Sequence, residues 1–344
     1  MKENFHNIYD RIGFLLLVLF VSFNSYLLPD FFLNKKEDLY CSSRLKEISR
    51  DICYHIFIEA GKIDVLFLGF SSLWVGLDSK SIEKDLSLNR NSKVVVRTIG
   101  MNHPGEDILE ILAKDLLARR KVKEAFISQP NRSTDRPHPY IHHILTRGDI
   151  GEGLGVIEKI RLNGLVSLRF FKNLMSVIFP YRKEWSVDYS SPWNGSTPRA
   201  SRWKKAKNLS LIQAKKSIRQ YRPILKAYKN NVIGVNSIGT VSMYQQKSLE
   251  RLRNTLYSKK TNLNLIYMPL YPEIREKNFK LRVNDSVLEN VPIWGQENFF
   301  AFEEINDNEA KTFFYNNNHL NNIGTYYFSR AFVKLYKELY FEKK

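Results

Sequence analysis

The chain has 344 residues, 43% of them hydrophobic, so it can bury a large core and is too apolar to be disordered. Its 53 lysines and arginines outnumber its 35 acidic residues, and the formal net charge of +18 favours anionic polymers or lipid headgroups as partners. The basic residues are dispersed, without zinc-finger spacing, a basic zipper or an RNA-binding aromatic signature. We therefore expect no nucleic-acid partner.

One apolar segment lies near the N-terminus. Residues 12–28 carry no charge, Pro29 and Asp30 mark the end of the segment, and its length is near the lower limit for crossing a bilayer. A cleaved signal peptide is the alternative, but no A-x-A-like pattern follows, which favours an uncleaved signal anchor in residues 1–33. More basic residues follow the segment than precede it, against the positive-inside rule, yet long domains translocate despite their charge. We expect a single-pass protein of the plasma or inner membrane, with residues 34–344 outside the cytoplasm.

Two cysteines, Cys41 and Cys53, lie in the juxtamembrane collar of residues 34–60. In an oxidising compartment they could pair, whereas in the cytosol they would be two ordinary thiols. Neither a CxxC pattern nor metal-ligand spacing accompanies them. We expect no metal and no cofactor.

The stretch 63–72 predicts a buried strand followed directly by a helix. Val65 to Leu68 are apolar, which is typical of a strand covered on both faces, and Gly69 ends the run. Ser71 then stands where the helix begins, with the first backbone N–H groups of that helix pointing at anything bound to it. This arrangement suits a nucleophile that must stabilise an oxyanion. The alternative is that Ser71 or Ser72 is only a helix N-cap.

Strands and helices alternate through much of the remaining chain. The apolar pattern predicts further strands at 93–100, 124–128 and 261–268 and a helix over 107–120. This alternation predicts a three-layer, flavodoxin-like α/β fold with a parallel sheet, in which function lies in the loops at the carboxyl ends of the strands.

Residues 140–260 interrupt that alternation and predict a helical insertion within an α/β domain of residues 61–344. We expect substrate specificity to be set by this insertion. Its segment 185–207 is rich in tryptophan and basic residues. That segment could contact a saccharide or phosphate, or it could be a solvated face.

The chain closes with an amphipathic helix that carries apolar residues from Ile323 to Leu339 on one side. His319 lies in the loop just before it. A single histidine in a loop is usually exposed, but one at the opposite end of the same fold can reach across the sheet edge. We expect His319 to meet Ser71.

Two blocks carry a resemblance to a known family. The first reads Gly69-Phe70-Ser71, with Gly-Leu-Asp downstream, and the last reads Asn316-Asn-Asn-His319-Leu-Asn-Asn-Ile-Gly324. They resemble the SGNH (GDSL-like) hydrolase superfamily, especially its membrane-anchored branch that adds or removes acyl groups on cell-envelope polymers, as in alginate O-acetylation and teichoic acid D-alanylation. The resemblance covers residues 61–135 and 261–344.

The resemblance implies roles for single residues. Ser71 would be the nucleophile and His319 the general base. The backbone N–H groups of Ser71 and Gly105 would hold the oxyanion, with Gly100 the rival for the second position, and Asn131 would add its side-chain amide. The implied protein is a serine esterase or O-acyltransferase without cofactor, acting on acyl esters of a cell-surface glycan or envelope polymer. A membrane acyltransferase is the implied partner.

Two positions depart from the family pattern. Phe70 replaces the usual Asp or Ser and leaves the backbone oxyanion donor intact. Asn316 replaces the Asp that orients the histidine, and loss of such a carboxylate can cost several powers of ten in rate. A Ser–His dyad could suffice, or another acid could serve His319. The alternative is a catalytically weak anchored subunit that binds an anionic polymer for a partner membrane acyltransferase. We favour an enzyme.

Overall fold

The computed structural model describes residues 13, 36–41, 51–88, 93–103, 105–128, 137–150, 155–178, 242–266, 268, 291–294, 314–316 and 319–341. Asn131, the segment 185–207 and all of the apolar segment 12–28 except Gly13 lie outside the described residues. Within the described ranges, no helix combines the length and apolarity needed to cross a bilayer.

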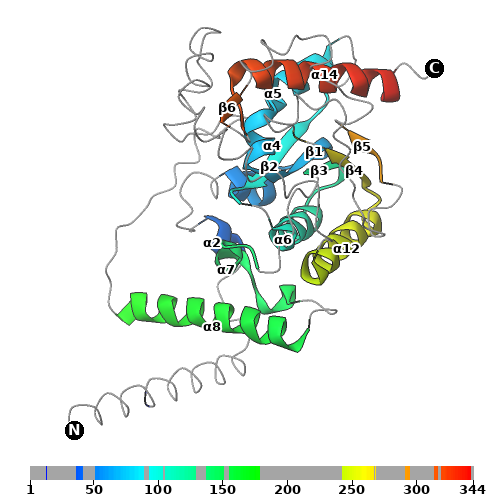
Figure 1. Ribbon diagram of the computed structural model, residues 1–344. Helices are drawn as coiled ribbons and strands as arrows, with labels where there is room; N and C mark the ends of the chain where they lie inside the picture. Colours follow the sequence, from blue (N-terminus) through cyan, green and yellow to red (C-terminus); the bar gives the residue numbers. More distant parts are fainter. Residues whose placement is uncertain are drawn as a thin grey trace. The chain divides into compact units, whose positions relative to one another are not determined.

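A five-stranded parallel sheet forms the centre of the fold (Figure 1). Its spatial order is β2-β1-β3-β4-β5, built from β1 Ile63–Phe70, β2 Val96–Met101, β3 Val122–Ser128, β4 Asn262–Ile266 and β5 Ile293–Trp294. Because β2 and β3 pair on opposite sides of β1, the order in which strands are added to the sheet reverses there. The carboxyl end of β1 is therefore the topological switch point, where open α/β sheets bind ligands. The α/β class with a parallel, flavodoxin-like strand order is confirmed.

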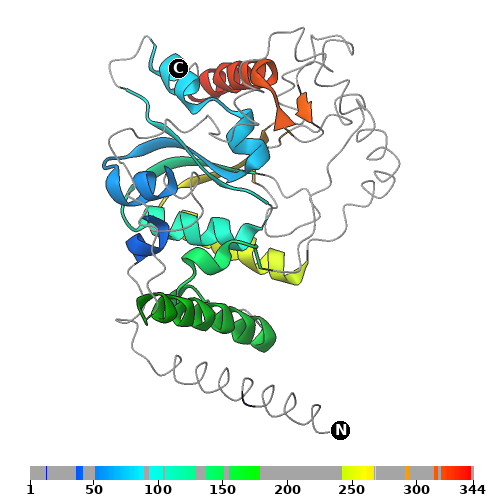
Figure 2. The same cartoon turned by 90° about the vertical axis from the view of Figure 1, so that its left-hand side faces the viewer.

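Helices cover both faces of this sheet (Figures 1 and 2). One face carries α4 Ser71–Gly76, α5 Ser79–Ser87 and α14 Asn322–Tyr340. The other carries α6 Glu106–Leu117 and α12 Met243–Ser258, and the short π-helix η2 Tyr54–Ile58 contacts α6. Since α12 packs on α6 and leads into β4, the end of the span 140–260 serves as a crossover helix of the sheet.

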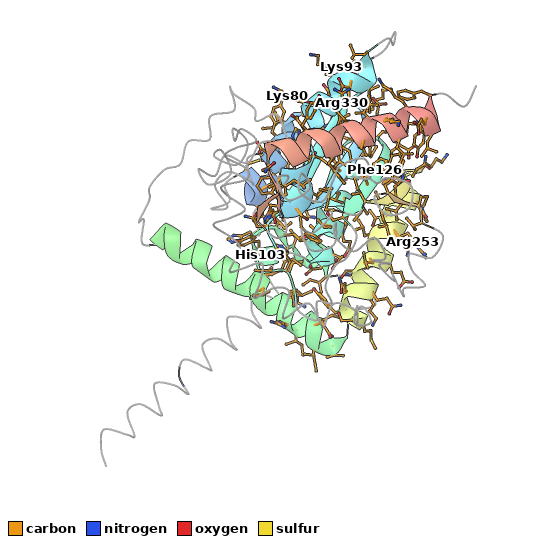
Figure 3. The ribbon with its side chains drawn as sticks, turned by 45° about the horizontal axis from the view of Figure 1, so that its top comes forward. Lys80, Lys93, His103, Phe126, Arg253 and Arg330 are labelled. Atoms are coloured by element: carbon orange, nitrogen blue, oxygen red, sulfur yellow. The ribbon has the colours of Figure 1, made fainter. Side chains whose placement is uncertain are left out.

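Aromatic side chains hold α14 against the sheet. The ring of Phe332 in α14 contacts the rings of Phe67 in β1 and Phe126 in β3 edge to face. The distances between ring centroids are 4.9 and 5.0 Å. Phe126, fully buried, is labelled in Figure 3, and Trp294 of β5 contacts it at 4.8 Å. This packing fixes the last helix and therefore the position of the residues just before it.

Immediately before α14, the chain forms a small hairpin of β6 Phe314–Asn316 and β7 His319–Leu320. Neither this hairpin nor the two-residue β5 was expected as a sheet element from sequence. Strands of two or three residues are too short to show an alternating pattern.

The chain divides into two compact units, residues 45–138 with 189–344, which contain the sheet, and residues 1–44 with 139–188. The second unit contains α2 Lys36–Cys41, α7 Ile141–Ile144, the 3-10 turn η3 Arg147–Asp149 and α8 Val156–Ile178. Lys36 forms an ion pair with the buried Asp149, Nζ to Oδ1 at 2.7 Å. Burial would raise the pKa of Asp149, but Lys36 and the bonds from Thr146 outweigh it and lower that pKa.

Both cysteines of the chain, Cys41 and Cys53, are disulfide-bonded. Because the sequence contains two cysteines, they are bonded to each other. The pairing considered from the sequence is therefore present. A structural disulfide is typical of proteins that fold outside the cytoplasm.

Candidate functional site

Ser71 and His319 are in contact although they lie 248 positions apart in the chain. Ser71 Oγ lies 2.9 Å from His319 Nε2, and His319 is only 8% exposed. Ser71 is the first residue of α4, whose N-cap is Phe70 and whose cap has no side-chain hydrogen bond. Ser71 is therefore not the N-cap, and its hydroxyl faces an imidazole.

Gly76 of α4 packs closely against the histidine-bearing strand. A Cβ there would clash with the end of the Met268 side chain and would lie in van der Waals contact, 3.4 Å, with Leu320 Cδ1 of β7. Thr325 Oγ1 donates a hydrogen bond of 3.1 Å to the carbonyl of Val75, which joins the first turn of α14 to α4. These contacts hold the segment around His319 over the start of α4.

The sequence block after His319 also has a structural role. Asn321 Oδ1 accepts a hydrogen bond of 3.1 Å from the N–H of Gly324, in the manner of a helix N-cap. This cap fixes where α14 begins, three residues after His319. The asparagine and glycine of the block thus set the entry of the chain into the helix.

Asn316 lies opposite His319 across the hairpin, as its backbone cross-strand partner. Residues directly opposite in an antiparallel pair are close neighbours on one face. The side chain of Asn316 is outside the described part of the structure, so an amide contact with the His319 ring stays a prediction.

Gly105 lies at the same edge of the sheet as Ser71. It is the N-cap of α6, and a Cβ there would come within 2.9 Å of His138 and 3.0 Å of Asp107 Oδ1. Gly100, the alternative candidate for the second oxyanion donor, lies within β2 opposite Gly69. That register aligns the ends of β1 and β2, so the loop that leads to Gly105 starts beside Ser71.

A buried polar cluster, which we call the α6 cluster, consists of Asp107, His138 and Tyr244. Asp107 Oδ2 accepts hydrogen bonds from the His138 backbone N–H at 2.9 Å and from the Tyr244 hydroxyl at 2.8 Å. His138 Nε2 lies 2.8 Å from the carbonyl of Asn102 and 3.1 Å from that of His103. The cluster therefore ties the loop between β2 and α6 to two distant parts of the chain.

Burial dominates the ionisation of the α6 cluster. It raises the pKa of Asp107 and lowers that of His138, while their mutual attraction and the hydrogen bonds act in the opposite direction. Burial, together with the nearby Asp107 carboxyl, also raises the pKa of Tyr244. Sequence reasoning missed this cluster. The available signal was Asp107 itself, a carboxyl one turn before Ile111 on the apolar side of the helix.

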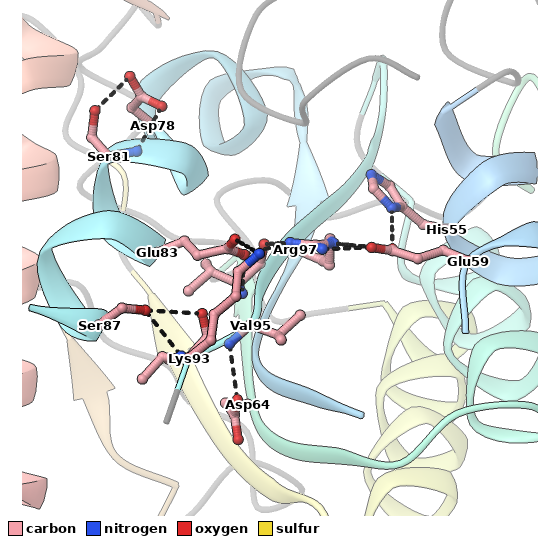
Figure 4. Close-up of polar contacts among 12 residues, drawn as sticks. His55, Glu59, Asp64, Asp78, Ser81, Glu83, Ser87, Lys93, Val95 and Arg97 are labelled. Atoms are coloured by element: carbon pink, nitrogen blue, oxygen red, sulfur yellow. Dashed lines mark hydrogen bonds and ion pairs between the residues drawn. The ribbon is translucent and has the colours of Figure 1, made fainter. Parts of the chain in front are cut away.

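A second polar cluster surrounds Arg97 in β2 (Figure 4). Its guanidinium binds Glu59 after η2 and Glu83 in α5, and Glu59 also receives bonds from Arg120 at 2.7 Å and His55 at 2.8 Å. Burial would raise the pKa of Glu59, but the bonds from His55 and Arg97 outweigh it and lower that pKa. Since each carboxylate here is matched by a cation, we interpret this cluster as a structural brace of η2, β2 and α5.

In the part of the chain that the structure describes, no three His, Cys, Asp or Glu side chains gather as a metal site. Of the residues implied from sequence, Ser71 and His319 are in contact, Gly105 lies one strand away at the same edge, and Asn316 is paired through its backbone. Comparison of the chain with protein-family models, with curated proteins and with solved structures finds no match.

Proposed function

We propose that this protein is a serine esterase or O-acyltransferase of the SGNH type. The observation that carries the proposal is the 2.9 Å contact between Ser71 Oγ and His319 Nε2 at the carboxyl end of β1. A hydroxyl hydrogen-bonded to an imidazole nitrogen is the ground-state arrangement of a serine nucleophile and its general base. The flavodoxin-like strand order, with the pair at its switch point, supports the same proposal.

The proposed reaction proceeds through an acyl-enzyme. Ser71 Oγ attacks the ester carbonyl carbon while its proton passes to His319 Nε2. The oxyanion is held by the backbone N–H groups of Ser71 and Gly105, with the Asn131 amide as third donor. Collapse breaks the bond to the alcohol, which leaves with the proton from His319. Water or a sugar hydroxyl then gives its proton to His319 and attacks the acyl-Ser71 carbonyl. Collapse of the second intermediate breaks the bond to Ser71 Oγ, which takes the proton back from His319, and the acid or the new ester leaves.

The proposed substrate is an acyl ester of a cell-surface glycan or envelope polymer. The net charge of +18 suits an anionic polymer, and the disulfide suits an extracytoplasmic domain. The apolar segment 12–28 would anchor the chain in the membrane, where a membrane acyltransferase could supply the acyl group.

Neighbouring serines offer a matched pair of variants. Ser71→Ala should lower turnover of a small activated acetate ester by about 10³-fold or more, because it removes the nucleophile. Ser72→Ala, one residue further along α4, should retain turnover close to that of the unmodified protein. Equal turnover of the two variants would contradict the assignment of Ser71.

The same assay addresses the alternative function, which Asn316 in place of Asp favours. If the folded full-length protein shows no turnover and still binds an anionic glycan, the chain is a polymer-binding subunit. In that case the Ser71–His319 contact is a remnant without catalytic use.

A further inference from the structure

Helix α8 exposes apolar side chains at its start. In this helix, Val156–Ile178, the side chains of Val156, Ile157 and Ile160 are 74%, 79% and 68% exposed. We call these three side chains, which lie together on one side of the first turns of the helix, the apolar stripe of α8. Exposed aliphatic residues are ordinary when scattered, but three large ones gathered on one side of a helix mark a surface that is covered by a partner.

The opposite side of α8 already has its protein contact. Leu162 and Val166 are buried, 3% and 1% exposed, and α8 contacts α7 within its compact unit (Figure 1). The exposed stripe is therefore a second apolar face, additional to the one that the helix uses in packing.

Basic residues accompany the stripe. The helix carries four basic residues, Lys159, Arg161, Arg169 and Lys172, against one acidic residue, Glu158. Arg161 is exposed beside Ile160. An apolar stripe with a basic flank matches a bilayer surface, where aliphatic side chains enter the acyl region and cations meet anionic headgroups.

Few residues separate the apolar segment 12–28 from the part of the chain that packs with α8. Lys36, the first residue of α2, follows Leu28 by eight positions, which span at most about 28 Å when fully extended. The helix α2 contacts α7, which contacts α8, and the Lys36–Asp149 ion pair fastens α2 to the turn between α7 and α8. If segment 12–28 enters a bilayer, α8 is held close to the surface of that bilayer.

We infer that α8 lies along the membrane surface, with Val156, Ile157 and Ile160 inserted among anionic lipids. The inference rests on the proposed membrane segment 12–28 and not on the chemistry of Ser71 and His319.

A fluorescent label can test this in the full-length protein. Ile160→Cys, labelled with a nitrobenzoxadiazole group, is compared with Met243→Cys, labelled in the same way, in vesicles of phosphatidylethanolamine and phosphatidylglycerol. Met243 is a matched control because it is 71% exposed at the start of another helix, α12. Flotation of the vesicles reports whether the chain is bound at all, and ester turnover is measured separately.

The label at position 160 should emit at shorter wavelength than the label at 243 and lose most of its fluorescence to doxyl-labelled lipids. Quenchers near the headgroups should act more strongly than quenchers at the bilayer centre, because an interfacial helix inserts only about 5–10 Å. Two outcomes would overturn the inference. One is equal, unquenched emission at both positions in floating vesicles. The other is a blue-shifted but unquenched label at 160, which would indicate a second copy of the protein covering the stripe.

Discussion

Two buried histidines in this protein face opposite kinds of partner. His138, 2% exposed, directs Nε2 at the carbonyl oxygens of Asn102 and His103. His319, 8% exposed, directs Nε2 at the hydroxyl of Ser71. A carbonyl oxygen can only accept a hydrogen bond, whereas a hydroxyl can also donate one.

The comparison separates a structural histidine from a candidate base. Nε2 of His138 must carry a proton to bond these carbonyls, so it is not available to accept one from a substrate. Nε2 of His319 can stay unprotonated, because the Ser71 hydroxyl supplies the proton of their hydrogen bond. Burial is similar in the two cases, and the partner atom decides the role.

The largest expected effect is on activity, at His319. His319→Ala should lower ester turnover by about 10³-fold or more, because it removes the general base. The variant should still fold, since the Asn321 cap and the Thr325–Val75 bond that hold α14 are left in place. Circular dichroism is the folding control. Undiminished turnover would show that His319 is not the base.

His138→Ala should instead act on stability. Truncation leaves the carbonyls of Asn102 and His103 without their imidazole donor and opens a cavity beside Gly105, at a cost of about 2–4 kcal/mol in the free energy of unfolding. Tyr244→Phe, which removes one hydrogen bond to Asp107, should cost about 1 kcal/mol. Urea unfolding measures both variants. A stability unchanged from the unmodified protein in both would disprove the bracing role of the α6 cluster.

Asn316→Asp should place a carboxylate at the position where the family pattern has one, across the hairpin from His319. The carboxylate would orient the ring and stabilise the imidazolium, so turnover of a small acetate ester should rise by about ten-fold or more. The gain should disappear when the change is combined with Ser71→Ala. A fall or no change would mean that another group already serves His319, or that the site is not catalytic.

The smallest expected effect is on pH dependence. The pKa of His138 and of His55 is lowered by burial in the folded state, so the unfolded chain binds these protons more readily. Their contribution to stability is present above about pH 6.5 and is lost as the pH falls, by up to about 1.4 kcal/mol per pH unit for each histidine. The raised pKa of Asp107 opposes this, because its contribution is greatest at low pH and is lost as the pH rises. Urea unfolding at pH 7.5 and 5.5 should show a smaller loss for His138→Gln than for the unmodified protein. An equal loss would show that His138 does not titrate in this range.

The residues that sequence could predict are those with a local pattern. The apolar run before Gly69 predicted β1, and the position of Ser71 after it predicted the site, because parallel strands end at one edge. His319 was predicted from its place before the last amphipathic helix, and its contact with Ser71 is present in the structure.

The α6 cluster had no such pattern. Asp107 and Tyr244 lie 137 positions apart and meet because α12 packs on α6, which no periodicity within either helix encodes. The short β5 was missed because a strand of two residues shows no alternating pattern. Substrate specificity was assigned to the span 140–260, of which residues 151–154 and 179–241 lie outside the described structure.

Covalent labelling of Ser71 tests the central claim most directly. The full-length protein is treated with a fluorophosphonate probe, and the modified peptide is identified by mass spectrometry. If His319 activates Ser71, the adduct should lie on Ser71, and His319→Ala should remove most of the labelling while His138→Ala, in whatever fraction folds, retains it. Labelling of His319→Ala equal to that of the unmodified protein, or an adduct on another residue, would contradict the account.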